Sequence, residues 1–211
     1  MKSILFTDEM VRAILAGRKT KTRRPLTPQP DDDAKIMIGE VGSSKGVAYI
    51  GDSTSGGHVT RVVSPFGKVG DRLWVREAFM LTVPNEKPMY RATWKNPDGI
   101  KWKPSLHMPR WASRITLEIT DIRVERVREI TEEEAEAEGA RKFTNLPPDP
   151  SLYPYGNEPR WSMEEPKSLR ECLGSARYAF ANLWERMYAK KGLGWNANPW
   201  VWVIGFRRVE G

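Results

Sequence analysis

Five cationic side chains gather within a run of eight residues near the start of the chain, from Gly17 to Arg24. Two threonines are interleaved with them, so the run carries Arg18, Lys19, Thr20, Lys21, Thr22, Arg23 and Arg24. Lysine and arginine donate charge-assisted hydrogen bonds to phosphate, and hydroxyl groups and backbone amides add neutral donors. We therefore predict a basic loop, here called the basic octet, that holds RNA or a modified nucleoside. A solvated surface loop without a ligand fits the same charge pattern.

Lys19 is the residue of the basic octet that could do acid–base chemistry. Neighbouring cations disfavour the charged form of a lysine, so the amine of Lys19 could be partly neutral near physiological pH. A neutral amine can act as a base or a nucleophile, and Thr22 lies close by in the sequence. We predict that Lys19 and Thr22 line one site.

An acidic helix predicted after Thr131 supplies a carboxylate that could complement Lys19. The helix carries Glu132, Glu133, Glu134, Glu136 and Glu138. Glu138 falls in the last turn, where like charges and the helix dipole both favour a protonated carboxyl. Such a group can accept and return a proton, as acyl transfer requires. The alternative is that these glutamates only solvate and cap the helix.

A second basic motif, which contains a tryptophan, follows Gly70-Asp71. In a strand, alternation would place Arg72, Trp74 and Arg76 on one face. A tryptophan flanked by arginines could stack on a base while the arginines hold phosphate. A structural role is the alternative, in which the adjacent Glu77 forms an ion pair with an arginine elsewhere in the fold.

The composition favours an anionic partner in a reducing compartment. The formal charge is +7 and the pI is near 9.5, which points to nucleic acid. The single cysteine, Cys172, and the widely separated His58 and His107 offer no compact zinc spacing, so we predict no metal and no cofactor. No apolar run is long enough to span a membrane and no secretory leader is visible, so we expect a cytoplasmic protein without a membrane partner. The sequence predicts no oligomeric state.

The elements that must position these residues follow from periodicity and capping signals. Helices are predicted from Thr7 to Gly17, after the capping box of Thr131 and Glu134, and from about Ser175 to Lys190. Strands are predicted at Val47–Ile50, Val59–Val63, Leu73–Val75, residues 114–127 and Trp200–Phe206. The last of these is apolar at nearly every position, which is typical of a strand covered on both faces.

Residues 25–45 and 144–174 are predicted insertions. Both are rich in proline and show little periodicity, and a segment of this length exceeds an ordinary connection. We therefore predict one α+β domain over residues 1–211, a small barrel or curled sheet with peripheral helices. The segment 144–174 would wrap the surface or cover a site.

The run from Ile14 to Arg24 resembles the signature loop of ASCH domains, a β-barrel group related to the PUA RNA-binding fold. Gly70-Asp71 before a strand, and Ile130-Thr131 leading to Glu138-Gly139, continue the resemblance in the expected order. The stretch from Asn198 to Trp202 is similar to the final strand of larger, phage- and prophage-associated members. The resemblance implies a PUA-like small β-barrel with peripheral helices and long loop insertions.

Within that superfamily, the basic octet is similar to the loop Gly-Arg-Lys-Thr-x-Thr-x-Arg of bacterial amidohydrolases that deacetylate N4-acetylcytidine. The lysine, threonine and glutamate of that family fall on Lys19, Thr22 and Glu138. The resemblance implies that Thr22 attacks the acetamide carbonyl, Lys19 activates it and Glu138 shuttles the proton. Other ASCH relatives act as RNA-binding modules or as ribonucleases. Both functions stay open as alternatives, the second with Lys19 and Arg24 stabilising a charged transition state.

Overall fold

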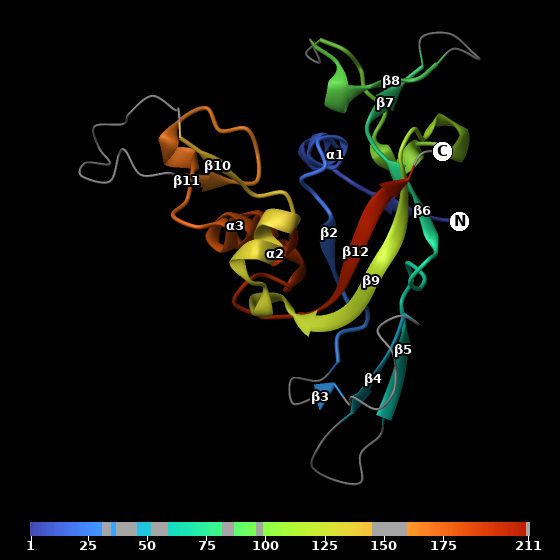
Figure 1. The fold of residues 1–211 in the computed structure, drawn as a ribbon, viewed down its shortest axis with the longest axis vertical. Helices are drawn as coiled ribbons and strands as arrows, with labels where there is room; N and C mark the ends of the chain where they lie inside the picture. The colour runs from blue at the N-terminus through green and yellow to red at the C-terminus, as the bar shows by residue number, and fades with distance from the viewer. Residues whose placement is uncertain are drawn as a thin grey trace. The chain divides into compact units, whose positions relative to one another are not determined.

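The chain has a mixed α+β structure. The computed structural model describes residues 1–30, 35–36, 46–51, 59–81, 87–95, 99–144 and 160–209. Within these residues three α-helices accompany a five-stranded sheet with the strand order β1-β6-β9-β12-β2 (Figure 1). Its strands are β1 (Lys2–Leu5), β6 (Arg72–Arg76), β9 (Thr116–Arg126), β12 (Trp200–Val209) and β2 (Lys21–Pro25). The predicted α+β class is confirmed, and the closed PUA-like barrel stays a prediction.

The chain divides into two compact units. Unit 1 comprises Met1–Gly17, Asp31–Arg123 and Ile204–Gly211, and unit 2 comprises Arg18–Pro30 and Val124–Val203. By their bounds, β9 and β12 each begin in one unit and end in the other. The single domain inferred from the sequence stays a prediction.

Helix α1 (Asp8–Leu15) follows β1 in unit 1 and forms as its local signals predict. Thr7 caps it by accepting a hydrogen bond from the Met10 amide at 3.4 Å. The chain leaves the helix through Gly17, whose φ of 72° lies in the left-handed region that glycine tolerates best. The apolar side of α1, including Val11 and Ile14, is buried.

The sheet of unit 1 has one buried face and one open face. β1 runs parallel to β6, with Ser3 opposite Trp74, and β9 runs antiparallel to β6, with Thr116 opposite Trp74. Along β6 the side chains of Leu73 and Val75 are buried, whereas Arg72, Trp74 and Arg76 are exposed or half-buried. The predicted alternation in this strand is confirmed.

Two small antiparallel sheets complete the strands of unit 1. One joins β3 (Lys35–Ile36), β4 (Val47–Gly51) and β5 (Val59–Val63), which confirms the predicted strands there. The other joins β7 (Phe79–Met80) and β8 (Met89–Tyr90), and three 3-10 turns follow it, η2 (Arg91–Thr93), η3 (Ser105–His107) and η4 (Arg110–Ala112). Most of the predicted insertion 25–45 lies outside the described residues.

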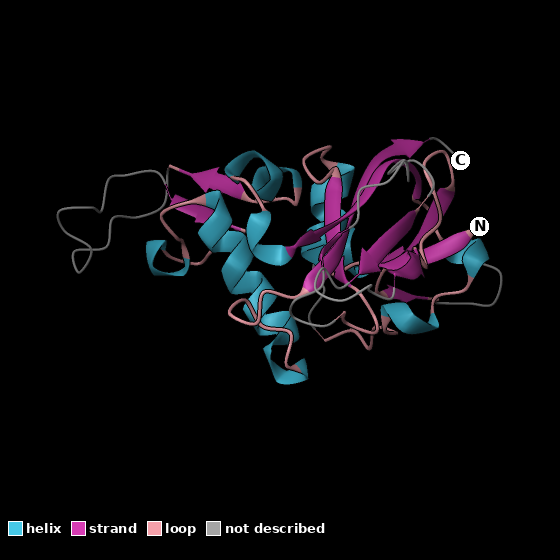
Figure 2. Ribbon diagram, turned by 90° about the horizontal axis from the view of Figure 1, so that it is seen from below, coloured by secondary structure: helices cyan, strands magenta, loops and turns pink. Residues whose placement is uncertain are grey.

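Unit 2 packs two helices around an apolar cluster. The helices are α2 (Glu132–Ala137), capped by Thr131, and α3 (Ala176–Tyr188), capped by Ser175 (Figure 2). The cluster gathers Val127, Ile130, Ala135, Ala140, Ala176, Phe180, Trp184, Tyr188, Val201 and Val203. In β12 every residue from Trp200 to Phe206 is buried, so the predicted strand with both faces covered is confirmed.

The hairpin of β10 (Arg141–Phe143) and β11 (Arg160–Ser162) also belongs to unit 2. β11 and the 3-10 turn η8 (Leu169–Glu171) fall within the predicted insertion 144–174, so its later part has defined structure. Residues 145–159 lie outside the described part of the chain. Among the described helices, none has the length and apolar character needed to cross a membrane.

An ion pair with a buried carboxylate links the residue after β6 to the segment before β9 in unit 1. The Nε of Arg114 lies 2.9 Å from Oε1 of Glu77, and its NH2 lies 2.9 Å from Oε2. The same guanidinium lies over the ring of Tyr90 at 3.9 Å and donates to the Thr93 hydroxyl at 3.0 Å. Burial raises the pKa of Glu77, and Arg114 opposes that shift. The structural alternative for Glu77, an ion pair with an arginine, is confirmed.

Replacing Arg114 with methionine should lower the free energy of unfolding by about 3 kcal/mol, because the Glu77 carboxylate would stay buried without its partner. Urea unfolding measures the loss. Without Arg114, the buried Glu77 carboxyl binds a proton more tightly in the folded state than in the unfolded state. The loss in free energy of unfolding should therefore shrink as the pH falls toward 4.5, the ordinary pKa of glutamate. The double variant Glu77→Gln/Arg114→Met should lose less than Arg114→Met alone. Equal losses would contradict the ion-pair account.

Candidate functional site

The basic octet is not the surface loop that its charge predicts. Its second half forms β2, the neighbour of β12 in the sheet, and the side chains of Lys19, Thr22 and Arg23 are buried. The loop prediction is therefore wrong for Lys21–Pro25. The physical reason is neutralisation: carboxylates of α2 pair with the cations and allow them to leave water.

Lys19 and Glu138 meet in the interior of unit 2. The Lys19 Nζ lies 2.6 Å from the Glu138 Oε2, and their side chains are 0% and 3% exposed. The same ammonium donates to the backbone carbonyls of Glu138 at 2.8 Å and Lys21 at 2.9 Å. An ammonium has three hydrogens, so these acceptors satisfy all of them. The structure thus brings together two of the three residues predicted to be catalytic.

The start of the basic octet wraps the C-terminal end of α2. The amide of Thr20 donates to the carbonyl of Ala137 at 2.8 Å, and Arg18 donates to the carbonyl of Gly139 at 3.2 Å. The last carbonyls of a helix lack partners within it and carry its partial negative charge. Arg18, predicted to hold phosphate, therefore donates to a carbonyl just past the end of α2 in this structure.

Burial lowers the pKa of Lys19. The ion pair and hydrogen bond with Glu138 oppose this shift, whereas the charges of Arg24 and Arg23 add to it. The direction agrees with the effect expected from neighbouring cations. The main cause differs, because desolvation outweighs the repulsion that the sequence suggests.

Arg23 is the centre of a buried ion network that the sequence did not predict. Its NH2 pairs with Glu134 and lies 3.2 Å from Oε2 of Glu125, and its NH1 lies 3.5 Å from Oε1 of Glu138. The other oxygen of Glu134 accepts from Lys21 at 2.8 Å. Glu134 and Glu138 are four residues apart on one helix face, and that spacing is the signal that could have revealed the network.

Thr22 lies in β2 between two residues that contact α2. Lys21 and Arg23 both pair with Glu134, so they share one face of the strand. Alternation places the buried Thr22 on the opposite face, together with the half-buried Arg24. The structure therefore separates Thr22 from Lys21 and Arg23 within the strand.

The remaining predicted ligands occupy different positions. Thr20 is exposed and Arg18 is half-buried, both in unit 2. Arg72, Trp74 and Arg76 lie on β6 in unit 1. Among the described residues, no group of His, Cys, Asp and Glu could hold a metal ion.

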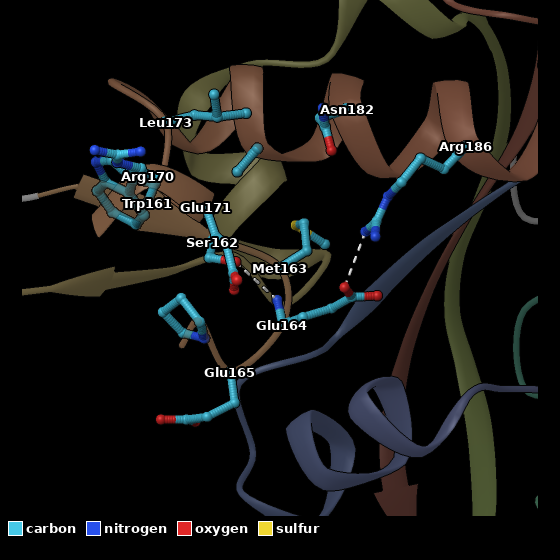
Figure 3. Close-up of a pocket in the computed structure, with 12 residues that line it drawn as sticks. Trp161, Ser162, Met163, Glu164, Glu165, Arg170, Glu171, Leu173, Asn182 and Arg186 are labelled. Atoms are coloured by element: carbon cyan, nitrogen blue, oxygen red, sulfur yellow. Dashed lines mark hydrogen bonds and ion pairs between the residues drawn. The ribbon is translucent and has the colours of Figure 1, made fainter. Parts of the chain in front are cut away.

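A separate hollow of about 280 Å³ in unit 2 is lined by residues of α3, β11 and the segment between them (Figure 3). Arg186 on α3 reaches Glu164 at 3.0 Å, and the Glu164 amide donates to the Ser162 hydroxyl at 3.2 Å. Arg186 and Glu164 are both substantially exposed. None of the residues predicted to be functional lines this hollow.

Comparison with known proteins finds a distant structural match. No family model and no curated protein sequence matches the chain. The crystal structure of protein EF3133 from Enterococcus faecalis V583, described with the family model DUF984, aligns with a TM-score of 0.42 at 10% sequence identity. The alignment covers 100% of this chain and 81% of that chain. So distant a likeness carries no argument about function, and the ASCH resemblance stays a prediction from the sequence motifs.

Replacing Glu134 with alanine should lower the free energy of unfolding by about 3 kcal/mol, because Arg23 would remain buried without its main partner. Denaturant unfolding followed by circular dichroism measures the change. Glu136→Ala on the same helix is the matched control, since that side chain is exposed and should change stability by no more than about 0.5 kcal/mol. Similar losses in both variants would show that removal of a negative charge from the helix, and not loss of the ion network, is responsible.

Proposed function

We propose that unit 2 hydrolyses the amide of an N4-acylated cytidine, with Lys19 as the base and Glu138 as the proton carrier. The observation that carries the proposal is the contact of 2.6 Å between the buried Lys19 ammonium and the Glu138 carboxylate. Burial lowers the pKa of Lys19, which favours the neutral amine that a general base requires. The similarity of the basic octet to the loop of N4-acetylcytidine amidohydrolases supplies the substrate class.

The short contact provides a route for the proton. In a site from which water is excluded, two opposite charges are both costly, so a proton that the neutral Lys19 amine takes up can pass to the Glu138 carboxylate. The transfer leaves a neutral amine on Lys19 and a carboxylic acid on Glu138. These are the base and the acid that amide cleavage needs.

The reaction then balances with water as the only co-reactant. Lys19 takes the hydroxyl proton of Thr22 and passes it to Glu138, and the Thr22 oxygen forms a bond to the acyl carbon. Glu138 gives its proton to the N4 nitrogen as the carbon–nitrogen bond breaks, which releases cytidine. Water then hydrolyses the acyl–threonine ester, so the acid leaves and the Thr22 hydroxyl is restored. Thr22 receives this role from the ASCH resemblance.

Two alternatives from the same resemblance fit the structure differently. A ribonuclease would need the positive charges of Lys19 and Arg24 beside a phosphodiester, and the contact of Lys19 with the Glu138 carboxylate, which neutralises its charge, argues against that arrangement. An RNA-binding module without turnover needs no catalytic pair. The charge of +7 supports RNA as a partner in either case.

Incubation with N4-acetylcytidine should yield cytidine, and Lys19→Arg should reduce the rate at least about 100-fold. Arginine keeps the positive charge but does not lose its proton, so it cannot serve as the base. Chromatography of the nucleosides follows the reaction. Lys21→Arg is the matched control and should retain most of the activity. Absence of turnover in the unaltered protein, or full turnover in Lys19→Arg, would refute the assignment. Loss of activity in Thr22→Val would separate attack by threonine from attack by water.

The rate should rise with pH because the active form of Lys19 is the neutral amine. Burial lowers the pKa of this group below 10.5, so kcat/KM should increase through that lowered pKa and level off before the ordinary lysine range is reached. Initial rates between about pH 6 and about pH 10 test this expectation. A rate that falls across the range would mean that Lys19 acts as an acid.

A further inference from the structure

The open face of β6 and the 3-10 turn η4 in unit 1 together carry an aromatic and arginine surface that the proposed hydrolysis does not use. We call it the arginine–tryptophan face; it consists of Arg72, Trp74, Arg76, Arg110 and Trp111. The ring of Trp74 lies at its centre. The guanidinium of Arg76 lies 5.3 Å from the ring centroid and that of Arg110 lies 5.8 Å from it. Cation–π contact holds both arginines beside the ring.

The arginines of this face are not neutralised by carboxylates of the described residues. Within the described part of the chain, neither Arg76 nor Arg110 has a carboxylate partner: Arg76 donates to the carbonyl of Leu106, and Arg110 to the sulfur of Met1 at 3.6 Å. Arg72 is exposed. Its register partner on β9, Glu118, is paired with Arg207 at 2.8 Å. The face is therefore positive, in contrast to the neutralised cations of unit 2.

Large apolar groups are exposed beside these charges. Trp111 is 61% exposed and Leu106 is 59% exposed, and both lie in the 3-10 turns that contact Arg76 or contain Arg110. An exposed apolar patch with a polar rim marks an interaction site more often than chance. Here the rim is cationic, which selects an anionic partner with flat apolar parts.

We propose that the arginine–tryptophan face binds single-stranded RNA. Bases would stack on the exposed ring of Trp111 and on the half-buried ring of Trp74, and phosphates would receive hydrogen bonds from Arg72, Arg76 and Arg110. A duplex keeps its bases stacked inside and offers only phosphates to such a surface, so the single strand fits better. The argument for a binding surface uses residues of unit 1 alone, and only the choice of RNA over DNA rests on the proposed function.

Fluorescence anisotropy with a labelled oligocytidylate of about ten nucleotides tests the proposal. Trp74→Leu should weaken binding about tenfold, since stacking on one aromatic ring contributes this order of affinity. Arg72→Gln should lower the slope of log K against log[salt] by about 0.7, the value for one phosphate contact to a single strand. Arg72 is exposed, so this second variant tests the face even if Trp74→Leu disturbs folding.

Matched controls lie on α3 in unit 2. Tyr178 is a 64% exposed aromatic residue and Arg186 is an exposed arginine, so Tyr178→Leu and Arg186→Gln should bind as the unaltered protein does. Equal loss in these controls would attribute binding to net charge and overturn the proposal. The proposal would also be overturned if Trp74→Leu and Arg72→Gln both bound the oligonucleotide as the unaltered protein does.

Further measurements, with DNA, with duplex RNA and of self-association, identify the partner. DNA of the same sequence bound as tightly as RNA would overturn the choice of RNA, and tighter binding to duplex RNA would overturn stacking. Self-association that Trp74→Leu abolishes, without any RNA binding, would make the face a protein interface. The assay measures binding alone, so absence of turnover on N4-acetylcytidine leaves its result unaffected.

Discussion

Unit 2 depends on the neutralisation of the basic octet by a single helix. Lys19, Lys21 and Arg23 pair with Glu138 and Glu134 of the α2 region. Moving such cations out of water without partners would cost several kcal/mol for each of them. With partners in place, the segment can pair as a strand and bury its neighbouring residues. The glutamate-rich helix and the lysine- and arginine-rich strand therefore depend on each other for burial.

The elements with local signals could be predicted from the sequence. The caps at Thr7, Thr131 and Ser175 and the alternation through Trp74 were sufficient, because each depends on neighbours within a few residues. The strand β2 could not be predicted in this way. Its cations find their carboxylates across more than a hundred residues of chain, and lysine and arginine are otherwise mostly exposed.

Only part of the candidate site could be predicted, because its ion pairs also join residues far apart in the sequence. The sequence motifs and the family resemblance together predict that Lys19 and Glu138 share one site, and in the structure the two side chains are in contact. Arg23 was predicted to be a phosphate ligand, whereas the structure places it in an internal network with Glu134 and Glu125. Net charge says which sign dominates in a chain, but it does not say which cations are already paired. Among the described residues, both outcomes occur: the arginines of β6 have no carboxylate partner, whereas the cations of β2 are paired.

Unit 2 is assembled from two separate stretches of chain, Arg18–Pro30 and Val124–Val203. The first stretch therefore cannot reach its final structure until the second has been synthesised. The ribosome delivers the basic octet well before Glu134 and Glu138 exist, so the octet must remain hydrated during most of synthesis. β2 can take its place only once β12, its neighbour in the sheet, has also been made. A nascent chain that stopped before Glu134 would therefore present an open polycation where the finished protein has a closed interior.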